Sequence, residues 1–135
     1  DWLFVEDHVD ALRAIMSRGR AGAVYNVGGA AERTNLELAV MLCDILDDLA
    51  PDADIGSRRS LIEFVKDRPG HDFRYAIDAA KLNRELGWAP KTAIDDGMRR
   101  TVSWYLSAGD WRRAIESGDY RAERLGLERA PGELQ

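Results

Sequence analysis

Short apolar runs that alternate with helical patterns constrain the fold of this chain more than any other feature. Residues 2–5, 23–27, 61–65 and 73–77 each have the apolar content or the two-residue alternation of a short strand. A complete doubly wound sheet needs more strands, in regular alternation with helices. We therefore predict a mixed α/β fold, namely a small helix-rich domain with short strands that is not a complete doubly wound domain.

Helical periodicity predicts the elements between these runs. We expect helices over residues 8–18, 34–49, 79–86 and 92–106, and a last helical piece around Trp111. Thr34 and Glu37 have the spacing of a capping box, and Asp7 and Asp78 are expected to cap the helices that follow them. Gly87 is expected in the left-handed conformation that ends a helix.

Apolar side chains on the predicted helices indicate which faces are buried. In the first helix the expected buried stripe consists of Val9, Leu12, Ala14, Ile15 and Met16. Cys43 lies in the apolar pattern of the second helix, which predicts a buried core thiol. The polar residues 52–60 predict a linker.

Composition and charge limit the classes of partner. The chain has 135 residues, of which 45% are hydrophobic and 32% charged, as in a folded domain of ordinary size. Its formal net charge of −5 argues against a nucleic-acid partner. No apolar run reaches the roughly 18 residues of a membrane span, and no signal peptide is recognisable, so we expect a cytoplasmic protein without a membrane partner. The chain opens inside an apolar run, which predicts that it begins within a longer protein.

Residues 67–78, DRPGHDFRYAID, form the strongest candidate for a binding site. Gly70 allows a ligand close to the backbone, Arg68 offers a planar guanidinium for phosphate, and His71 offers a hydrogen-bond donor. The alternative is a solvated turn in which Arg68 pairs with a neighbouring aspartate. Arg74 is a second cation that could meet an anionic ligand. Three apolar side chains of this stretch are expected to pack and hold the site in place: Phe73, Tyr75 and Ile77.

Asn35 is the other candidate, at the start of the second helix. Its amide, together with free backbone N–H groups at the helix start, could contact an anionic ligand. Alternatively, Asn35 supports the cap at Thr34. Gly28 and Gly29 follow a predicted strand but do not match a dinucleotide-binding loop, so we expect them to permit a sharp turn that brings Asn35 to a cleft.

The residue inventory contains little catalytic machinery. The spacing of Asp67, Asp72 and Asp78 matches no metal-binding loop, so no metal site is expected. With two histidines and one cysteine, no Ser-His-Asp or Cys-His arrangement is evident.

Several motifs, in this order and at this spacing, resemble the C-terminal part of the dTDP-glucose 4,6-dehydratases, which belong to the extended short-chain dehydrogenases. They are DWLFVEDHVDAL, YNVGG, ERTNLE, DRPGHDFRYAIDAAKLNRELGW and TVSWYL. The resemblance covers about residues 1–112 and implies a C-terminal nucleotide-sugar-binding domain, with residues 113–135 as a helical piece and a loosely held tail. DRPGHD with RYAID is the specific part of the match.

The resemblance implies a lyase of deoxysugar biosynthesis that converts dTDP-glucose to dTDP-4-keto-6-deoxyglucose. Family members bind NAD on an N-terminal Rossmann domain, which also carries a Tyr-x-x-x-Lys pair and is the main dimer contact. No Tyr-x-x-x-Lys pair and no NAD loop occur in this chain, so it is expected to be inactive alone, without catalytic or cofactor-binding residues. By resemblance, Asn35, Arg68 and His71 face the nucleotide diphosphate.

Two other hypotheses for the function of the chain are consistent with the sequence. The chain could belong to a UDP-sugar epimerase or decarboxylase of the same family, which share the DWLFVED and YNVGG segments more loosely. It could also be a non-catalytic fragment that only packs against the Rossmann domain of its parent protein. For the parent enzyme the resemblance implies a homodimer.

Overall fold

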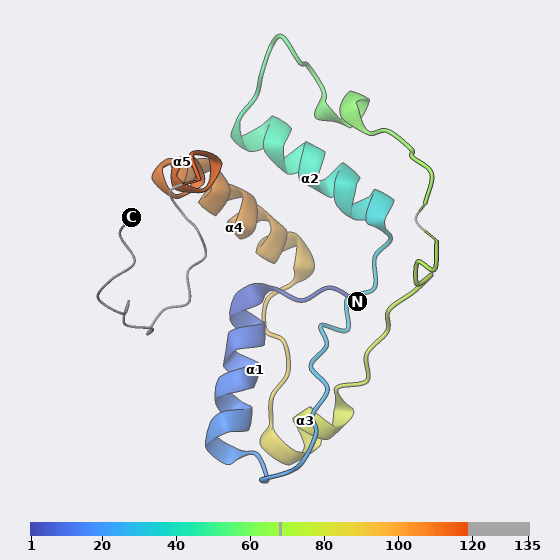
Figure 1. The fold of residues 1–135 in the computed structure, drawn as a ribbon, viewed down its shortest axis with the longest axis vertical. Coiled ribbons are helices and arrows are strands. Elements are labelled where there is room, and N and C mark those ends of the chain that lie inside the picture. The colour runs from blue at the N-terminus through green and yellow to red at the C-terminus, as the bar shows by residue number, and fades with distance from the viewer. Residues whose placement is uncertain (68, 119–135) are drawn as a thin grey trace, which may run out of the picture. The chain divides into compact units, whose positions relative to one another are not determined.

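The computed structural model describes residues 1–67 and 69–118 (Figure 1). The chain divides into two compact units, Asp1–Ser103 and Trp104–Gln135, and each is described by itself. The helical elements are α1 (Val5–Arg18), α2 (Asn35–Leu49), the 3-10 helix η1 (Arg58–Leu61), α3 (Ala80–Leu86), α4 (Ile94–Ser107) and α5 (Gly109–Glu116). The predicted boundary after residue 112 stays a prediction.

The prediction of short strands is wrong, whereas the helix-rich character is confirmed. None of the four predicted runs pairs into a ladder within the described residues. A strand is defined by repeated backbone hydrogen bonds to a neighbour, and these runs show only isolated ones, such as the bond from the Trp2 N–H to the Ala31 carbonyl at 3.0 Å. The stretch between η1 and α3 is accordingly drawn without helix or strand (Figure 1).

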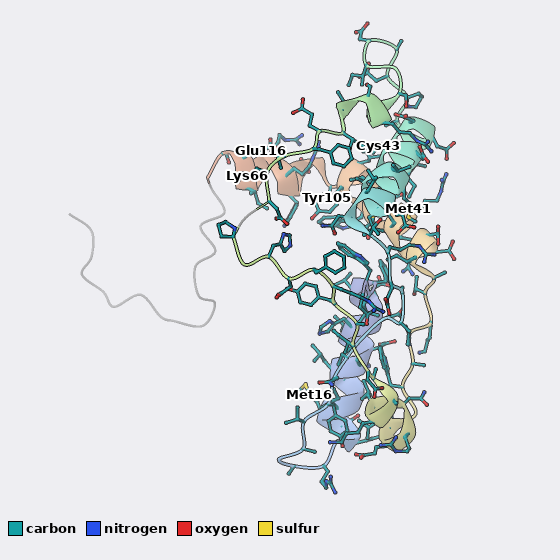
Figure 2. The ribbon with its side chains drawn as sticks, turned by 90° about the vertical axis from the view of Figure 1, so that its right-hand side faces the viewer. Met16, Met41, Cys43, Lys66, Tyr105 and Glu116 are labelled. Carbon is teal, nitrogen blue, oxygen red and sulfur yellow. The ribbon has the colours of Figure 1, made fainter. Side chains whose placement is uncertain are left out.

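Helix α1 begins earlier than predicted and buries a different face. Phe4 is its N-cap, so Asp7 lies inside the helix and is not the cap. The buried face is formed by Phe4, Asp7, Ala11 and Ala14 at helical spacing. Three members of the predicted stripe are exposed instead, namely Val9, Leu12 and Met16. Met16 points away from the helix into solvent (Figure 2).

Asp7 has a structural role that its sequence position did not predict. Its carboxylate is only 5% exposed, and Oδ2 accepts hydrogen bonds from the backbone N–H groups of Lys91 at 3.1 Å and Thr92 at 2.8 Å. The buried carboxylate therefore ties α1 to the segment that leads into α4. Near this contact, Gly97 lies so close to the Phe4 ring that a Cβ there would meet it at 3.0 Å.

The core of the first unit lies between α1 and α3, and α3 lies beside the C-terminal end of α1 (Figure 1). We call it the α1–α3 core: its buried residues are Ala11, Leu82, Leu86 and Trp88. Gly87 ends α3 in the left-handed conformation with φ 67°, as predicted. Asp78 accepts the Ala80 N–H at 2.8 Å, so its predicted bond at the start of this helix is present, although Ala79 is the N-cap.

Helix α2 matches its prediction closely. Thr34 is the N-cap and forms a complete capping box with Glu37, and the helix ends at Leu49 before Pro51. Hydrogen bonds from the backbone N–H and hydroxyl of Thr34 lower the pKa of Glu37.

Residues 52–60 are not a free linker, because η1 folds back onto α2. The Arg58 guanidinium binds Asp47 at 2.8 Å and the Ala50 carbonyl at 2.7 Å, and Arg59 pairs with Asp44. Cys43 is half-buried and donates to the Arg58 carbonyl at 3.3 Å (Figure 2), so it is not the core thiol that we predicted. These polar contacts hold η1 against the C-terminal part of α2.

The second unit contains the end of α4 and all of α5, which confirms the predicted last helical piece. Trp104, Tyr105 and Trp111 meet edge to face, with ring centroids 4.9–6.0 Å apart. Among the helices of the described residues, none is long and apolar enough to cross a membrane.

Candidate functional site

A cleft of about 660 Å³ opens in the first unit beside the start of α2. One side is formed by residues 32–37, and the other by residues 71–77, which we call the cleft wall. The lining residues are Asp1, Trp2, Glu32, Arg33, Thr34, Asn35, Glu37, His71, Asp72, Phe73, Arg74, Tyr75 and Ile77. The cleft thus brings together two segments that are almost forty positions apart in the sequence.

Asn35 and His71, two of the three predicted site residues, lie in this cleft. Asn35 is the first residue of α2 and is exposed; the cap is Thr34, so the Asn35 amide is not used for capping. His71 Nδ1 lies 2.5 Å from Asp67 Oδ1, which leaves Nε2 as the ring nitrogen for a ligand. The third predicted residue, Arg68, lies outside the described residues.

Asp1 anchors both sides of the cleft, a role for which the sequence carries no signal. Its Oδ1 accepts the N–H groups of Gly29 at 3.1 Å and Ala31 at 3.3 Å, and its Oδ2 accepts the N–H of Ile77 at 3.1 Å. The backbone nitrogen of Asp1 donates to the Tyr75 carbonyl at 3.0 Å. One residue therefore joins the cleft wall to the loop that leads into α2.

Gly28 and Gly29 fit against the chain itself. A Cβ at Gly28 would lie 2.8 Å from Asp1 Oδ2 and 2.9 Å from the Ile77 Cβ, and one at Gly29 would lie 1.9 Å from the Trp2 carbonyl oxygen. Glycine is needed at both positions because side chains of Asp1 and Ile77 lie against Gly28 and the backbone of Trp2 lies against Gly29. A side chain at either position would therefore collide with the chain itself.

The cleft wall is held by polar contacts and not by apolar packing. Arg74 pairs with Glu32, with Nε at 2.9 Å and Nη2 at 2.5 Å from the same Oε2. Tyr75 donates its hydroxyl hydrogen to Asp72, and this hydrogen bond raises the pKa of Tyr75. The prediction that Phe73, Tyr75 and Ile77 hold the wall by packing is wrong, because their exposed fractions are 104%, 56% and 43%.

Several of the described lining residues carry groups that can donate hydrogen bonds. Amide, imidazole and guanidinium groups at the start of a helix are suited to phosphate oxygens. Within the described residues no group of three or more His, Cys, Asp or Glu side chains is placed to hold a metal ion. The described lining thus offers hydrogen-bond donors suited to an anionic ligand.

Comparisons with known proteins identify the family of the chain. The family described as GDP-mannose 4,6 dehydratase matches residues 1–101. The chain is 49% identical to dTDP-glucose 4,6-dehydratase from Neisseria meningitidis serogroup B over 128 residues, which is 93% of this chain and 36% of that protein. It is 48% identical to the Salmonella typhimurium enzyme of the same name over 122 residues, covering 90% of this chain and 33% of that protein.

A solved structure shows the same fold. The dTDP-glucose 4,6-dehydratase from Streptomyces venezuelae, solved with NAD and TYD bound, is 38% identical and superimposes with a TM-score of 0.71, covering 82% of this chain and 32% of that one. The chain spans about a third of the length of the curated relatives that it matches. The resemblance read from its motifs is therefore confirmed, and the chain belongs to the GDP-mannose 4,6-dehydratase family.

Proposed function

We propose that this chain is the substrate-binding part of an NAD-dependent dTDP-glucose 4,6-dehydratase. The observation that carries the proposal is the shared cleft: Asn35 and His71, which come from distant segments, line one cavity of suitable size for a nucleotide. The relatives that match nearly the whole chain carry the name of this enzyme.

Each residue has a distinct task in this proposal. The Asn35 amide donates to phosphate or sugar oxygens, aided by the free N–H groups at the start of α2. His71 donates from Nε2, while Asp67 on Nδ1 holds the ring in place. Arg68 supplies the guanidinium that pairs with the diphosphate.

Oxidation and reduction require NAD, which the described residues do not fit. The glycine pair at positions 28 and 29 does not match a dinucleotide-binding loop, and the chain contains no Tyr-x-x-x-Lys pair. We therefore assign NAD and the catalytic groups to a Rossmann domain of the parent enzyme, outside these residues. What this chain contributes is the binding and orientation of the nucleotide-sugar.

The parent enzyme in this proposal is a lyase of the short-chain dehydrogenase family. It works in the cytoplasm as a homodimer, with its main dimer contact on the Rossmann domain. The 135-residue chain by itself is expected to give no turnover of dTDP-glucose when NAD is added. Turnover would show that the catalytic groups lie within the chain after all.

Calorimetric titration of the chain with dTDP tests the binding role. We expect saturable binding that is weakened about tenfold by Asn35→Ala and by His71→Ala, because each removes a hydrogen bond to a charged ligand. His8→Ala is the matched control for His71→Ala: His8 is exposed on α1 and outside the cleft, so the affinity should not change.

Two results would contradict the proposal. If the unmodified 135-residue chain does not bind dTDP, the cleft is not a nucleotide site on its own. If UDP binds more tightly than dTDP, the substrate is a UDP-sugar and the chain belongs with the epimerases or decarboxylases.

A further inference from the structure

Carboxylates outnumber cations around the described cleft, which is unexpected for a site that binds an anion. Four carboxylates, Asp1, Glu32, Glu37 and Asp72, and two arginines, Arg33 and Arg74, line it. The formal charge of the whole chain is also negative, at −5. Among the described lining residues, an incoming diphosphate therefore meets more negative than positive side chains.

Three of the four carboxylates are held by uncharged donors. Asp1 accepts backbone N–H groups, Glu37 accepts the N–H and hydroxyl of Thr34, and Asp72 accepts the Tyr75 hydroxyl. Glu32 differs, because its carboxylate pairs with the guanidinium of Arg74. Glu32 is thus the lining carboxylate that occupies a cation.

The geometry of this pair allows exchange. Arg74 directs both Nε and Nη2 to a single oxygen, Oε2 of Glu32, so the two-oxygen fork of an ideal arginine–carboxylate pair is not formed. Both side chains are half exposed, at 64% and 50%. Exposed pairs of this kind are weak because water and salt screen them.

We propose that Glu32 is a specificity-determining residue, which competes with the ligand for Arg74 and so lowers the affinity of the site for the most highly charged ligands. A diphosphate offers several charged oxygens and can engage the Arg74 fork with two of them, which Glu32 does not do. A neutral ligand does not engage Arg74, so its affinity does not depend on the Glu32–Arg74 pair. The inference rests on the proposed function, because it concerns the same diphosphate site.

Titration of the 135-residue chain with dTDP, dTMP and thymidine at low salt tests this competition. Glu32→Gln should bind dTDP about three- to tenfold more tightly, because a like charge near the phosphates is removed and Arg74 is released. The gain for dTMP should be smaller, and thymidine should show no gain. Arg74→Gln should weaken dTDP binding about tenfold.

The double variant Glu32→Gln/Arg74→Gln separates competition from simple repulsion. If Glu32 acts by occupying Arg74, most of the gain from Glu32→Gln is lost when Arg74 is absent, and the two effects are not additive. Asp110→Asn is the matched control, since Asp110 pairs with Arg113 on α5 and is not among the lining residues; its affinity for dTDP should equal that of the unmodified chain.

The outcomes distinguish this inference from the proposed function. If the unmodified 135-residue chain binds dTDP and the Glu32→Gln variant binds it with the same or lower affinity, the proposed role of Glu32 is overturned. The proposed substrate site is not affected by that result. Additive effects in the double variant also overturn the proposed role of Glu32. If neither the unmodified 135-residue chain nor any variant binds dTDP, both the role of Glu32 and the proposed function are overturned.

Discussion

The α1–α3 core and the cleft wall are stabilised by different kinds of contact. Leu82 and Ala11 are fully buried in the core, whereas Phe73 in the wall is fully exposed. The wall is held by polar contacts from Asp1, Glu32 and Asp72. Apolar burial provides most of the free energy of folding, while exposed polar contacts contribute little. One side of the cleft is therefore formed by a segment with little apolar burial, as is common for ligand-binding segments.

The largest expected effect comes from removing apolar volume in the core. Leu82→Ala should lower the free energy of unfolding by about 2–5 kcal/mol, because it leaves a cavity at a position with no solvent exposure. Urea denaturation followed by circular dichroism measures this change. A loss below about 1 kcal/mol would mean that the core does not carry the stability that we assign to it.

The next effect concerns the buried carboxylate of Asp7. Asp7→Ala leaves the N–H groups of Lys91 and Thr92 without their acceptor, which should cost about 2 kcal/mol of unfolding free energy. Asp10→Ala is the control on the same helix, because Asp10 makes only surface ion pairs with Arg13 and Lys91; it should cost less than about 0.5 kcal/mol. Equal losses from both variants would contradict the role of Asp7.

At the border of the cleft, the capping box should have an intermediate effect. Thr34→Ala removes the acceptor for the Glu37 N–H and should cost about 1 kcal/mol of unfolding free energy. Thr34→Ser keeps the hydroxyl and should retain nearly all of the stability. Thermal unfolding of the two variants in parallel tests the contribution of this cap, and identical melting temperatures would contradict it.

Lowering the pH should reduce the stability contributed by contacts of α2 more than that contributed by the α1–α3 core. Hydrogen bonds from Thr34 lower the pKa of Glu37, and hydrogen bonds from Arg59 and Arg58 lower the pKa values of Asp44 and Asp47. A carboxyl group with a lowered pKa in the folded state stabilises the protein above its unfolded pKa, and this contribution is lost as the pH falls through the folded pKa. The melting temperature should therefore decrease when the pH is lowered below about 4.

The triple variant Glu37→Gln, Asp44→Asn, Asp47→Asn provides the comparison for that titration. Its melting temperature should be lower than that of the parent at pH 7 and should depend less on pH below 4. The same acid slope in parent and variant would assign the pH dependence to other groups.

The smallest effect on stability is expected in the cleft wall. Phe73→Ala should change the unfolding free energy by less than about 0.5 kcal/mol, because the ring makes no buried contact in this structure. Comparison with Leu82→Ala under the same conditions measures the difference between the two regions. A cost near that of Leu82→Ala would show that the wall is packed and would remove the contrast.

Local sequence signals determined several features of this protein by themselves. The capping box at Thr34, the left-handed Gly87 and the bounds of α2 were predicted correctly, because caps and helix ends depend on side chains within a few positions. Membership of the family was also readable from the motifs. Asn35 and His71 were predicted site residues, and the structure places both in one cleft.

Other features were decided only by the tertiary structure. Strand formation depends on a partner for the backbone, so the apolar runs at residues 2–5 and 61–65 stayed unpaired although their composition indicated strands. Asp1 and Asp7 gained their roles from backbone N–H groups that are more than 25 positions away. Such contacts leave no periodic pattern in the sequence, because they depend on which segments the folded core brings together.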